Sequence, residues 1–145
     1  MIKQILIVPS VIVVLLSFAN FSNSNISETD KTDSIIVDGL KRTWLIHIPP
    51  SYDKTKSMPL LIALHGGGGT GRNMLNLTMG SFDTIANKKG FFVVYPDGIE
   101  KYWNDGRNSK EIRYWTQREK IDDVGFISAL IDHLIKEMNI DPKKV

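Results

Sequence analysis

Apolar residues follow different patterns along the chain, and each pattern predicts a different kind of element. Residues 42–48 alternate between apolar and polar positions, and residues 35–37 form a short β-branched run before Asp38-Gly39, so these segments predict an antiparallel hairpin. Residues 60–64 and 91–95 are apolar without interruption. Continuous apolarity predicts strands that are covered on both faces.

Two helices are predicted from apolar residues that recur every three or four positions. The stronger repeat lies near the end of the chain and consists of Val124, Ile127, Leu130, Ile131, Leu134, Ile135 and Met138. Asp122 is placed to cap this helix, and Asn139 and Pro142 are placed to end it. A shorter helix is predicted within residues 81–89, with Gly90 positioned to close it.

Together these elements predict an α/β fold for residues 34–145. Their order is strand, strand, strand, helix, strand, helix, and residues 143–145 form the approach to a further strand. Strands that alternate with helices predict an antiparallel hairpin leading into a mostly parallel sheet with helices on both faces. Residues 96–120 have no sustained period, which predicts an extended surface loop before the last helix.

The first 24 residues differ in character from the rest of the chain. A single cation, Lys3, precedes an apolar run over residues 5–19, which predicts a signal peptide cleaved after Ala19 or Ser24. The alternative is an uncleaved N-terminal anchor, although the run is shorter than the roughly 20 residues that span a bilayer. Residues 25–33 are polar and predict a flexible leader. The body of the protein is therefore expected to be secreted, extracellular or periplasmic, without stable membrane association after cleavage.

Composition narrows the classes of function further. The formal net charge is +2 and charged residues make up 23% of the chain, so no nucleic-acid partner is predicted. The chain has no cysteine, which excludes disulfides, thiolate metal sites and cysteine nucleophiles within it. The hydrophobic share of 42% is enough to expect a packed core.

A glycine cluster directly after the strand at residues 60–64 carries the most distinctive chemistry. His65 is followed by four glycines, which leave backbone N–H groups unobstructed and able to bind an anion. A phosphate loop is disfavoured because no Gly-Lys-Ser or Gly-Lys-Thr ending follows, and a dinucleotide loop because no apolar helical period begins inside the glycines. A strand followed by His-Gly-Gly-Gly is typical of one half of an oxyanion hole in esterases and lipases. A flexible turn without a ligand is the alternative.

Further segments of the sequence, taken in their order and spacing, extend this interpretation. They are residues 42–50 with Tyr52, the strand with residues 65–69, Val94-Tyr95-Pro96-Asp97-Gly98, Trp103-Asn104, residues 122–127 and Ile140-Asp141-Pro142. In this arrangement residues 42–145 resemble the secreted polyhydroxybutyrate depolymerase and feruloyl esterase group of the α/β-hydrolase superfamily. The resemblance implies a serine-type carboxylic ester hydrolase without a cofactor. Its implied substrates are feruloyl or acetyl esters of plant polysaccharide, or short polyhydroxyalkanoate esters.

The resemblance also implies that this chain is an N-terminal fragment of such a domain. In the superfamily the catalytic serine lies in a Gly-x-Ser-x-Gly elbow, followed by the acid and then the histidine. The chain contains no such motif, so it is expected to stop just before the elbow and to be inactive alone. His47 and His133 have no serine partner at a recognisable elbow and are not expected to be catalytic.

The predicted site is therefore half of an oxyanion hole. The backbone N–H groups of Gly67 and Gly68 are the candidate donors, and His65 is expected to support the loop by hydrogen bonding. No catalytic side chain is assigned within this chain.

Aromatic and acidic residues beyond the loop have two interpretations each. Trp103, Tyr114 and Trp115 are candidates for substrate binding because their segment follows the C-terminal end of a strand; packing of the loop onto the sheet is the alternative. Asp122 and Asp123 fit a helix cap and a dipole partner better than metal ligands, so no metal site is predicted. Two other functions stay open, namely a serine peptidase of the same fold and a non-catalytic polysaccharide-binding module.

Overall fold

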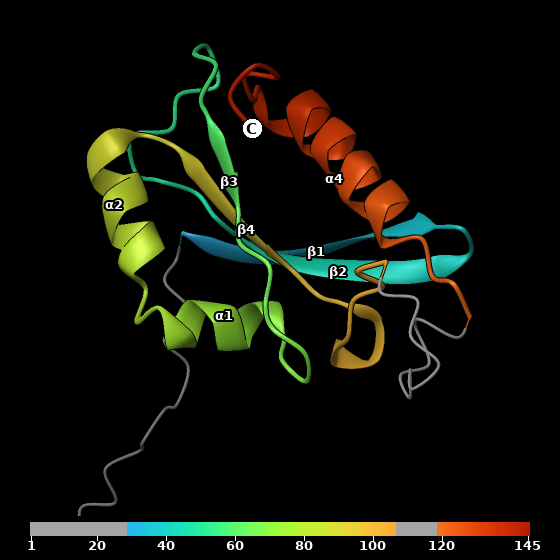
Figure 1. Cartoon of the computed structure of the whole chain (residues 1–145). Coiled ribbons are helices and arrows are strands. Elements are labelled where there is room, and N and C mark those ends of the chain that lie inside the picture. Colours follow the sequence, from blue (N-terminus) through green and yellow to red (C-terminus); the bar gives the residue numbers. More distant parts are fainter. Residues whose placement is uncertain (1–28, 107–118) are drawn as a thin grey trace, which may run out of the picture.

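The computed structural model describes residues 29–106 and 119–145, which form a four-stranded sheet with helices on both faces (Figure 1). The strands are β1 (Asp30–Val37), β2 (Leu40–His47), β3 (Leu60–Ile62) and β4 (Phe92–Pro96). The helices are α1 (Gly71–Leu77), α2 (Ser81–Lys89) and α4 (Asp123–Met138), with the short 3-10 helix η1 (Ile99–Lys101) after β4. The predicted signal peptide, residues 1–24, lies outside the described residues.

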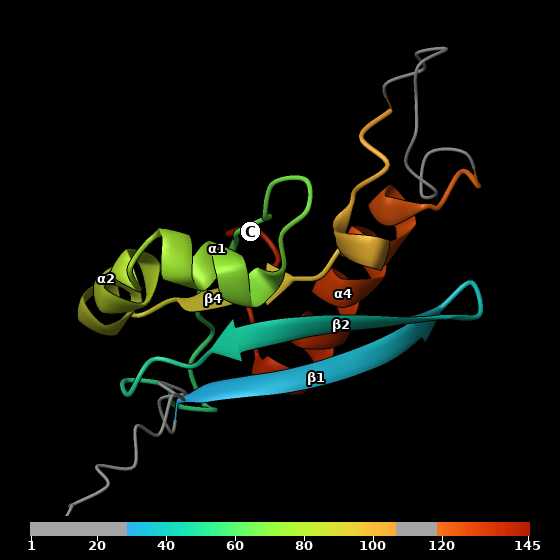
Figure 2. The same ribbon diagram turned by 90° about the horizontal axis from the view of Figure 1, so that it is seen from below.

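The strands run across the sheet in the order β1-β2-β4-β3. β1 and β2 form the predicted antiparallel hairpin, which turns at Asp38 and Gly39 with φ values of 50° and 75° (Figure 2). β4 pairs antiparallel with β2 on one side and parallel with β3 on the other. The α/β fold class expected from the sequence is confirmed, and β3 with β4 is the parallel pair among the described strands.

Alternate residues of the central strands face opposite layers. Trp44 of β2 and Val94 of β4 belong to the core under α4, whereas Leu45, Val93 and Tyr95 belong to the core under α1 and α2. Figure 1 shows α1 and α2 together on one side of the sheet and α4 on the other. All of β4 is buried, which explains why its sequence is continuously apolar.

The helix ends follow the local signals in the sequence. α2 has the predicted bounds, and Gly90 closes it with a left-handed φ of 74°. The Asp122 carboxylate caps α4 by accepting a hydrogen bond from the Gly125 N–H at 2.7 Å, and Asn139 ends the helix in the left-handed conformation. No helix within the described residues is long and apolar enough to cross a membrane.

The apolar stripe of α4 differs from the prediction at its first turn, whereas Ile127, Ile135 and Met138 pack against the core as expected. The helix buries Phe126, Leu130 and Leu134 against the sheet. Val124, which was counted in the stripe, is 79% exposed. In the first turn of α4, Phe126 is therefore the apolar side chain that packs against the sheet, in place of Val124.

Two strands and one helix differ most from the predictions. β1 begins at Asp30, inside the predicted leader, because it pairs with β2 along its whole length and these backbone hydrogen bonds outweigh its polar composition. β3 ends at Ile62, earlier than residue 64, and the Leu64 side chain is 47% exposed. Helix α1, which was not predicted, begins at Gly71 directly after the glycines, where the Thr70 hydroxyl accepts from the Asn73 N–H at 3.1 Å.

Candidate active site at the glycine loop

The glycine loop, residues 65–69, lies between β3 and α1, at the edge of the sheet where the carboxyl ends of β3 and β4 meet. Because the two strands are parallel, the segment after β4 leaves the sheet beside this loop. In open α/β sheets ligands bind at this edge. The candidate site is therefore built from two loops that are about 30 residues apart in sequence and joined by the contacts below.

The His65 side chain connects the two loops. Its Nε2 accepts a hydrogen bond from the Gly98 N–H at 2.9 Å, so Nδ1 carries the proton and donates to the Gly66 carbonyl oxygen at 2.7 Å. The residue is only 4% exposed. Both ring nitrogens are engaged, so His65 positions the glycine loop in the way expected from the sequence and has no nitrogen left for proton transfer.

Trp103 holds the same junction from the other side. Its indole N–H donates to the His65 carbonyl oxygen at 2.9 Å, and the two rings lie with their centroids 4.9 Å apart. Trp103 also packs against the core under α4. These contacts correspond to the packing interpretation of Trp103, although the residue also lines the groove described below. Tyr114 and Trp115, the other aromatic candidates, lie outside the described residues.

The two predicted oxyanion donors differ in their availability. The Gly68 N–H donates to the Lys101 carbonyl oxygen at 2.8 Å, and the residue has a left-handed φ of 79°. Its amide is therefore already used by the segment after β4, which corrects its assignment as a free donor. The Gly67 N–H has no hydrogen-bond partner among the described residues. Of the two predicted oxyanion donors, the Gly67 N–H is therefore the one that is available.

An open groove of about 580 Å³ lies between the glycine loop and the first turns of α4. It is lined by Leu64, His65, Gly66, Gly67, Trp103, Asn104, Asp105, Asp123, Val124 and Ile127. Leu64 is about half exposed and Val124 is largely exposed, and these apolar side chains help to make the walls of the groove mainly apolar. A groove of this kind suits an uncharged group, and Gly67 is part of its lining.

A buried ion pair fixes the α4 wall of the groove. Arg42 Nη2 of β2 lies 2.6 Å from Asp123 Oδ1, and their side chains are 1% and 6% exposed. The second carboxylate oxygen accepts from the Asn104 N–H at 2.6 Å, and the guanidinium lies 3.9 Å from the centroid of the Phe126 ring. Sequence reasoning missed this pair because its members are 81 residues apart and Asp123 was interpreted as a helix-dipole partner.

Asp97 holds the backbone in place just after the glycine loop, at the start of α1. One carboxylate oxygen accepts from the Gly71 N–H and the other from the Thr43 hydroxyl, each at 2.7 Å. A Cβ at Gly71 would come closer to the Tyr95 carbonyl oxygen than real Cβ atoms do. Asp97 and Gly71 therefore hold the start of α1 tightly against the end of β4. Asp97 belonged to the motif used above, but no role was predicted for it.

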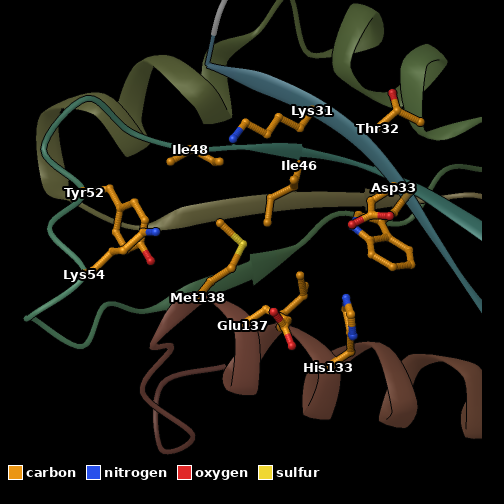
Figure 3. A pocket seen from close by; sticks show the side chains of 12 residues that line it. Lys31, Thr32, Asp33, Ile46, Ile48, Tyr52, Lys54, His133, Glu137 and Met138 are labelled. Carbon is orange, nitrogen blue, oxygen red and sulfur yellow. The ribbon is translucent and has the colours of Figure 1, made fainter.

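A second hollow, of about 540 Å³, lies between the hairpin and the last turns of α4 (Figure 3). Lys31, Lys54 and Glu137 lie around it in Figure 3, and the ring of His133 meets Trp44 edge-on at 5.5 Å. No residue predicted for the site lines it, and His133 has the structural setting expected from the sequence. The glycine-loop groove is therefore the candidate active site.

Curated proteins are similar to parts of this chain, whereas no family model matches it. The bifunctional acetylxylan esterase/xylanase XynS20E of Neocallimastix patriciarum is 31% identical over 100 residues, which are 69% of this chain and 13% of that protein. A probable dipeptidyl-aminopeptidase B of Arthroderma gypseum is 38% identical over 66 residues, which are 45% of this chain and 7% of that protein. The chain thus spans a small part of both proteins.

Solved structures of esterases share the arrangement of the strands and helices. A ferulic acid esterase of Anaeromyces mucronatus, in complex with ferulic acid, matches 83% of this chain and 47% of its own, with a TM-score of 0.53 and 16% identity. An S-formylglutathione hydrolase of Staphylococcus aureus matches 79% of this chain and 43% of its own, with a TM-score of 0.51 and 14% identity. At such identities the likeness shows the fold alone. The chain therefore has part of an α/β-hydrolase fold of the kind found in esterases.

Proposed function

We propose that the protein carrying this chain is a serine-type carboxylic ester hydrolase, and that the glycine loop contributes the Gly67 N–H to its oxyanion hole. The observation that carries the proposal is an amide without a partner among the described residues, on a loop that borders an apolar groove at the end of β3. Similarity to an acetylxylan esterase/xylanase over 69% of the chain supports the same reaction class.

In this proposal the chain positions the substrate and stabilises charge. The acyl group lies in the groove, and its carbonyl oxygen accepts a hydrogen bond from Gly67 as the tetrahedral intermediate forms. A serine, an acid and a histidine from sequence beyond this chain perform the covalent and proton-transfer steps, with a second amide completing the hole. His65 keeps the Gly67 amide in place through its bonds to Gly66 and Gly98.

We propose feruloyl or acetyl esters of plant polysaccharide as substrates. The similar proteins include an acetylxylan esterase/xylanase and a ferulic acid esterase solved with ferulic acid, and the mainly apolar groove fits an aromatic or short acyl group. Short polyhydroxyalkanoate esters remain a candidate from the sequence resemblance. Action on a polymer outside the cell agrees with the predicted signal peptide over residues 1–24.

The test compares variants of Gly67 in the full-length protein. Gly67→Pro removes the amide hydrogen, whereas Gly67→Ala keeps it; an added Cβ meets the Tyr102 ring at 3.5 Å, an ordinary contact. With methyl ferulate and p-nitrophenyl acetate, Gly67→Pro should lower kcat by about 10²-fold to 10³-fold, the usual effect of losing one oxyanion donor. Gly67→Ala should lose far less. Equal kcat values for Gly67→Pro and the unmodified protein would overturn the role of this amide.

The serine peptidase alternative is supported by the 38% identity to a dipeptidyl-aminopeptidase B over 66 residues. Both reactions use the same oxyanion chemistry, so the groove does not separate them. The two reactions are separated by measuring hydrolysis of a dipeptidyl p-nitroanilide in parallel with hydrolysis of p-nitrophenyl acetate. Turnover of the anilide at a higher kcat/KM would favour the peptidase. Binding to insoluble xylan without hydrolysis of either substrate would favour a binding module.

A further inference from the structure

A second polar cluster lies apart from the groove, under α2. It contains Asp30 at the start of β1, His47 at the end of β2 and Asp83 in the first turn of α2. Asp30 and His47 are direct partners across the hairpin. The side chains are 4%, 3% and 14% exposed, so three ionisable groups share a nearly closed space. Neither the groove nor the proposed ester hydrolysis uses them.

Their ligand atoms have the spacing of a metal site. His47 Nδ1 lies 2.8 Å from Asp30 Oδ1 and 3.6 Å from Asp83 Oδ2, and one ligand atom of each residue falls within 4.8 Å of the others. Ligand atoms about 2.0–2.2 Å from a tetrahedral zinc ion lie roughly 3.3 Å from one another. Side-chain adjustments of a few tenths of an ångström to about one ångström would bring all three atoms onto one ion.

Two of the three candidate ligands, His47 and Asp83, are also oriented through their other polar atom. His47 Nε2 donates to Asn87 Oδ1 at 2.8 Å, and the Tyr95 hydroxyl donates to Asp83 Oδ1 at 2.5 Å. Nδ1 of the histidine and Oδ2 of the aspartate therefore face each other. Metal-binding histidines and carboxylates are usually held by hydrogen bonds of this kind.

The charges of the cluster favour a cation. Among the ion pairs of the described residues, neither carboxylate is paired with a lysine or arginine, and His47 is the basic partner of both. A divalent cation between His47 Nδ1 and the two carboxylates would neutralise both of them.

We propose that Asp30, His47 and Asp83 bind one zinc-like divalent cation, with His47 Nδ1 and one oxygen from each carboxylate as its protein ligands. One nitrogen and two oxygen ligands suit zinc, whereas calcium takes six to eight oxygens and magnesium a near-ideal octahedron of them. The 14% exposure of Asp83 leaves a path for the ion and for a water as fourth ligand. The ion would join the start of β1 and the start of α2 to the end of β2, as a stabilising site.

The test measures metal binding by the full-length protein, expressed without an affinity tag and treated with a chelator. Titration with Zn²⁺ against a chromophoric chelator should give one ion per chain and a higher Tm. Asp30→Asn, His47→Gln and Asp83→Asn should each weaken binding by at least about 10²-fold, since each removes a ligand, and Tyr95→Phe by about tenfold or more. Asp132→Asn and His133→Gln on α4 are matched controls and should leave binding unchanged.

A measurement on the unmodified protein covers the case in which a ligand variant fails to fold. In ¹H–¹⁵N spectra of the histidine side chains, Zn²⁺ should shift Nδ1 of His47 and leave His65 and His133 unchanged. Ca²⁺ at the same concentration should raise Tm far less than Zn²⁺. The proposal is overturned if the folded protein binds no stoichiometric Zn²⁺, if folded ligand variants bind it as well as the unmodified protein, or if Ca²⁺ stabilises equally.

Discussion

Removing the carboxylate of Asp123 should strongly destabilise the protein, because it leaves the Arg42 guanidinium buried without its counter-charge. Arg42 is 2% exposed, and its Nε already lacks a hydrogen-bond partner within residues 29–106 and 119–145. Breaking a buried pair by removing one partner costs about 3–5 kcal/mol. Asp123→Ala also removes the acceptor of the Asn104 N–H, so the upper part of that range is expected.

The neighbouring acid provides a matched control for this prediction. Asp122→Ala removes the cap of α4 at an exposed position and should cost only about 1 kcal/mol. Urea unfolding of the full-length protein, followed by circular dichroism, compares the two free energies of unfolding. The double variant Arg42→Met with Asp123→Leu should recover part of the lost stability, because no uncompensated charge remains. A cost for Asp123→Ala no larger than that for Asp122→Ala would refute the reasoning.

Three further predictions concern the supports of the site and the cluster under α2. Gly71→Ala places a Cβ against the Tyr95 carbonyl and should cost about 1–3 kcal/mol, measured as a lower Tm; an unchanged Tm would contradict the close approach. His65→Ala leaves the buried Gly98 N–H without its acceptor and should cost about 1–3 kcal/mol and lower kcat/KM; unchanged kinetics would show that His65 does not position the loop. Without metal, the Asp83 carboxyl should titrate above the ordinary aspartate range in ¹³C spectra, because burial raises its pKa. The contribution of this carboxyl to stability is then greatest at low pH and is lost as the pH rises through its pKa in the folded protein. Titration of Asp83 within the ordinary aspartate range would contradict this prediction.

Local signals in the sequence were sufficient for much of the fold. The hairpin turn at Asp38-Gly39, the bounds of α2 and the Asp122 cap of α4 were all predicted, because each depends on residues within a few positions of one another. The continuous apolarity of β4, which is also a local pattern, correctly predicted that this strand is buried on both faces. These features confirm the fold class from pattern alone.

The remaining features depend on partners that are distant in the chain. The strand character of Asp30 comes from its pairing with His47, and the polar composition around Asp30 gave no sign of it. The amide of Gly68 is engaged by Lys101, from a segment without any periodic pattern. Helix α1 had a local signal, the Thr70 cap, but it is only seven residues long and has no sustained apolar repeat. Sequence reasoning therefore found the loop and not the contacts that decide which of its amides is available.

A structure of the full-length protein with a phosphonate ester covalently bound tests the central claim most directly, since the phosphonyl oxygen mimics the oxyanion of the tetrahedral intermediate. The account predicts a serine adduct with this oxygen about 2.7–3.1 Å from the Gly67 nitrogen, and with the Gly68 N–H still bonded to the Lys101 carbonyl. A phosphonyl oxygen held by other donors, with the Gly67 N–H facing away from it, would contradict the account.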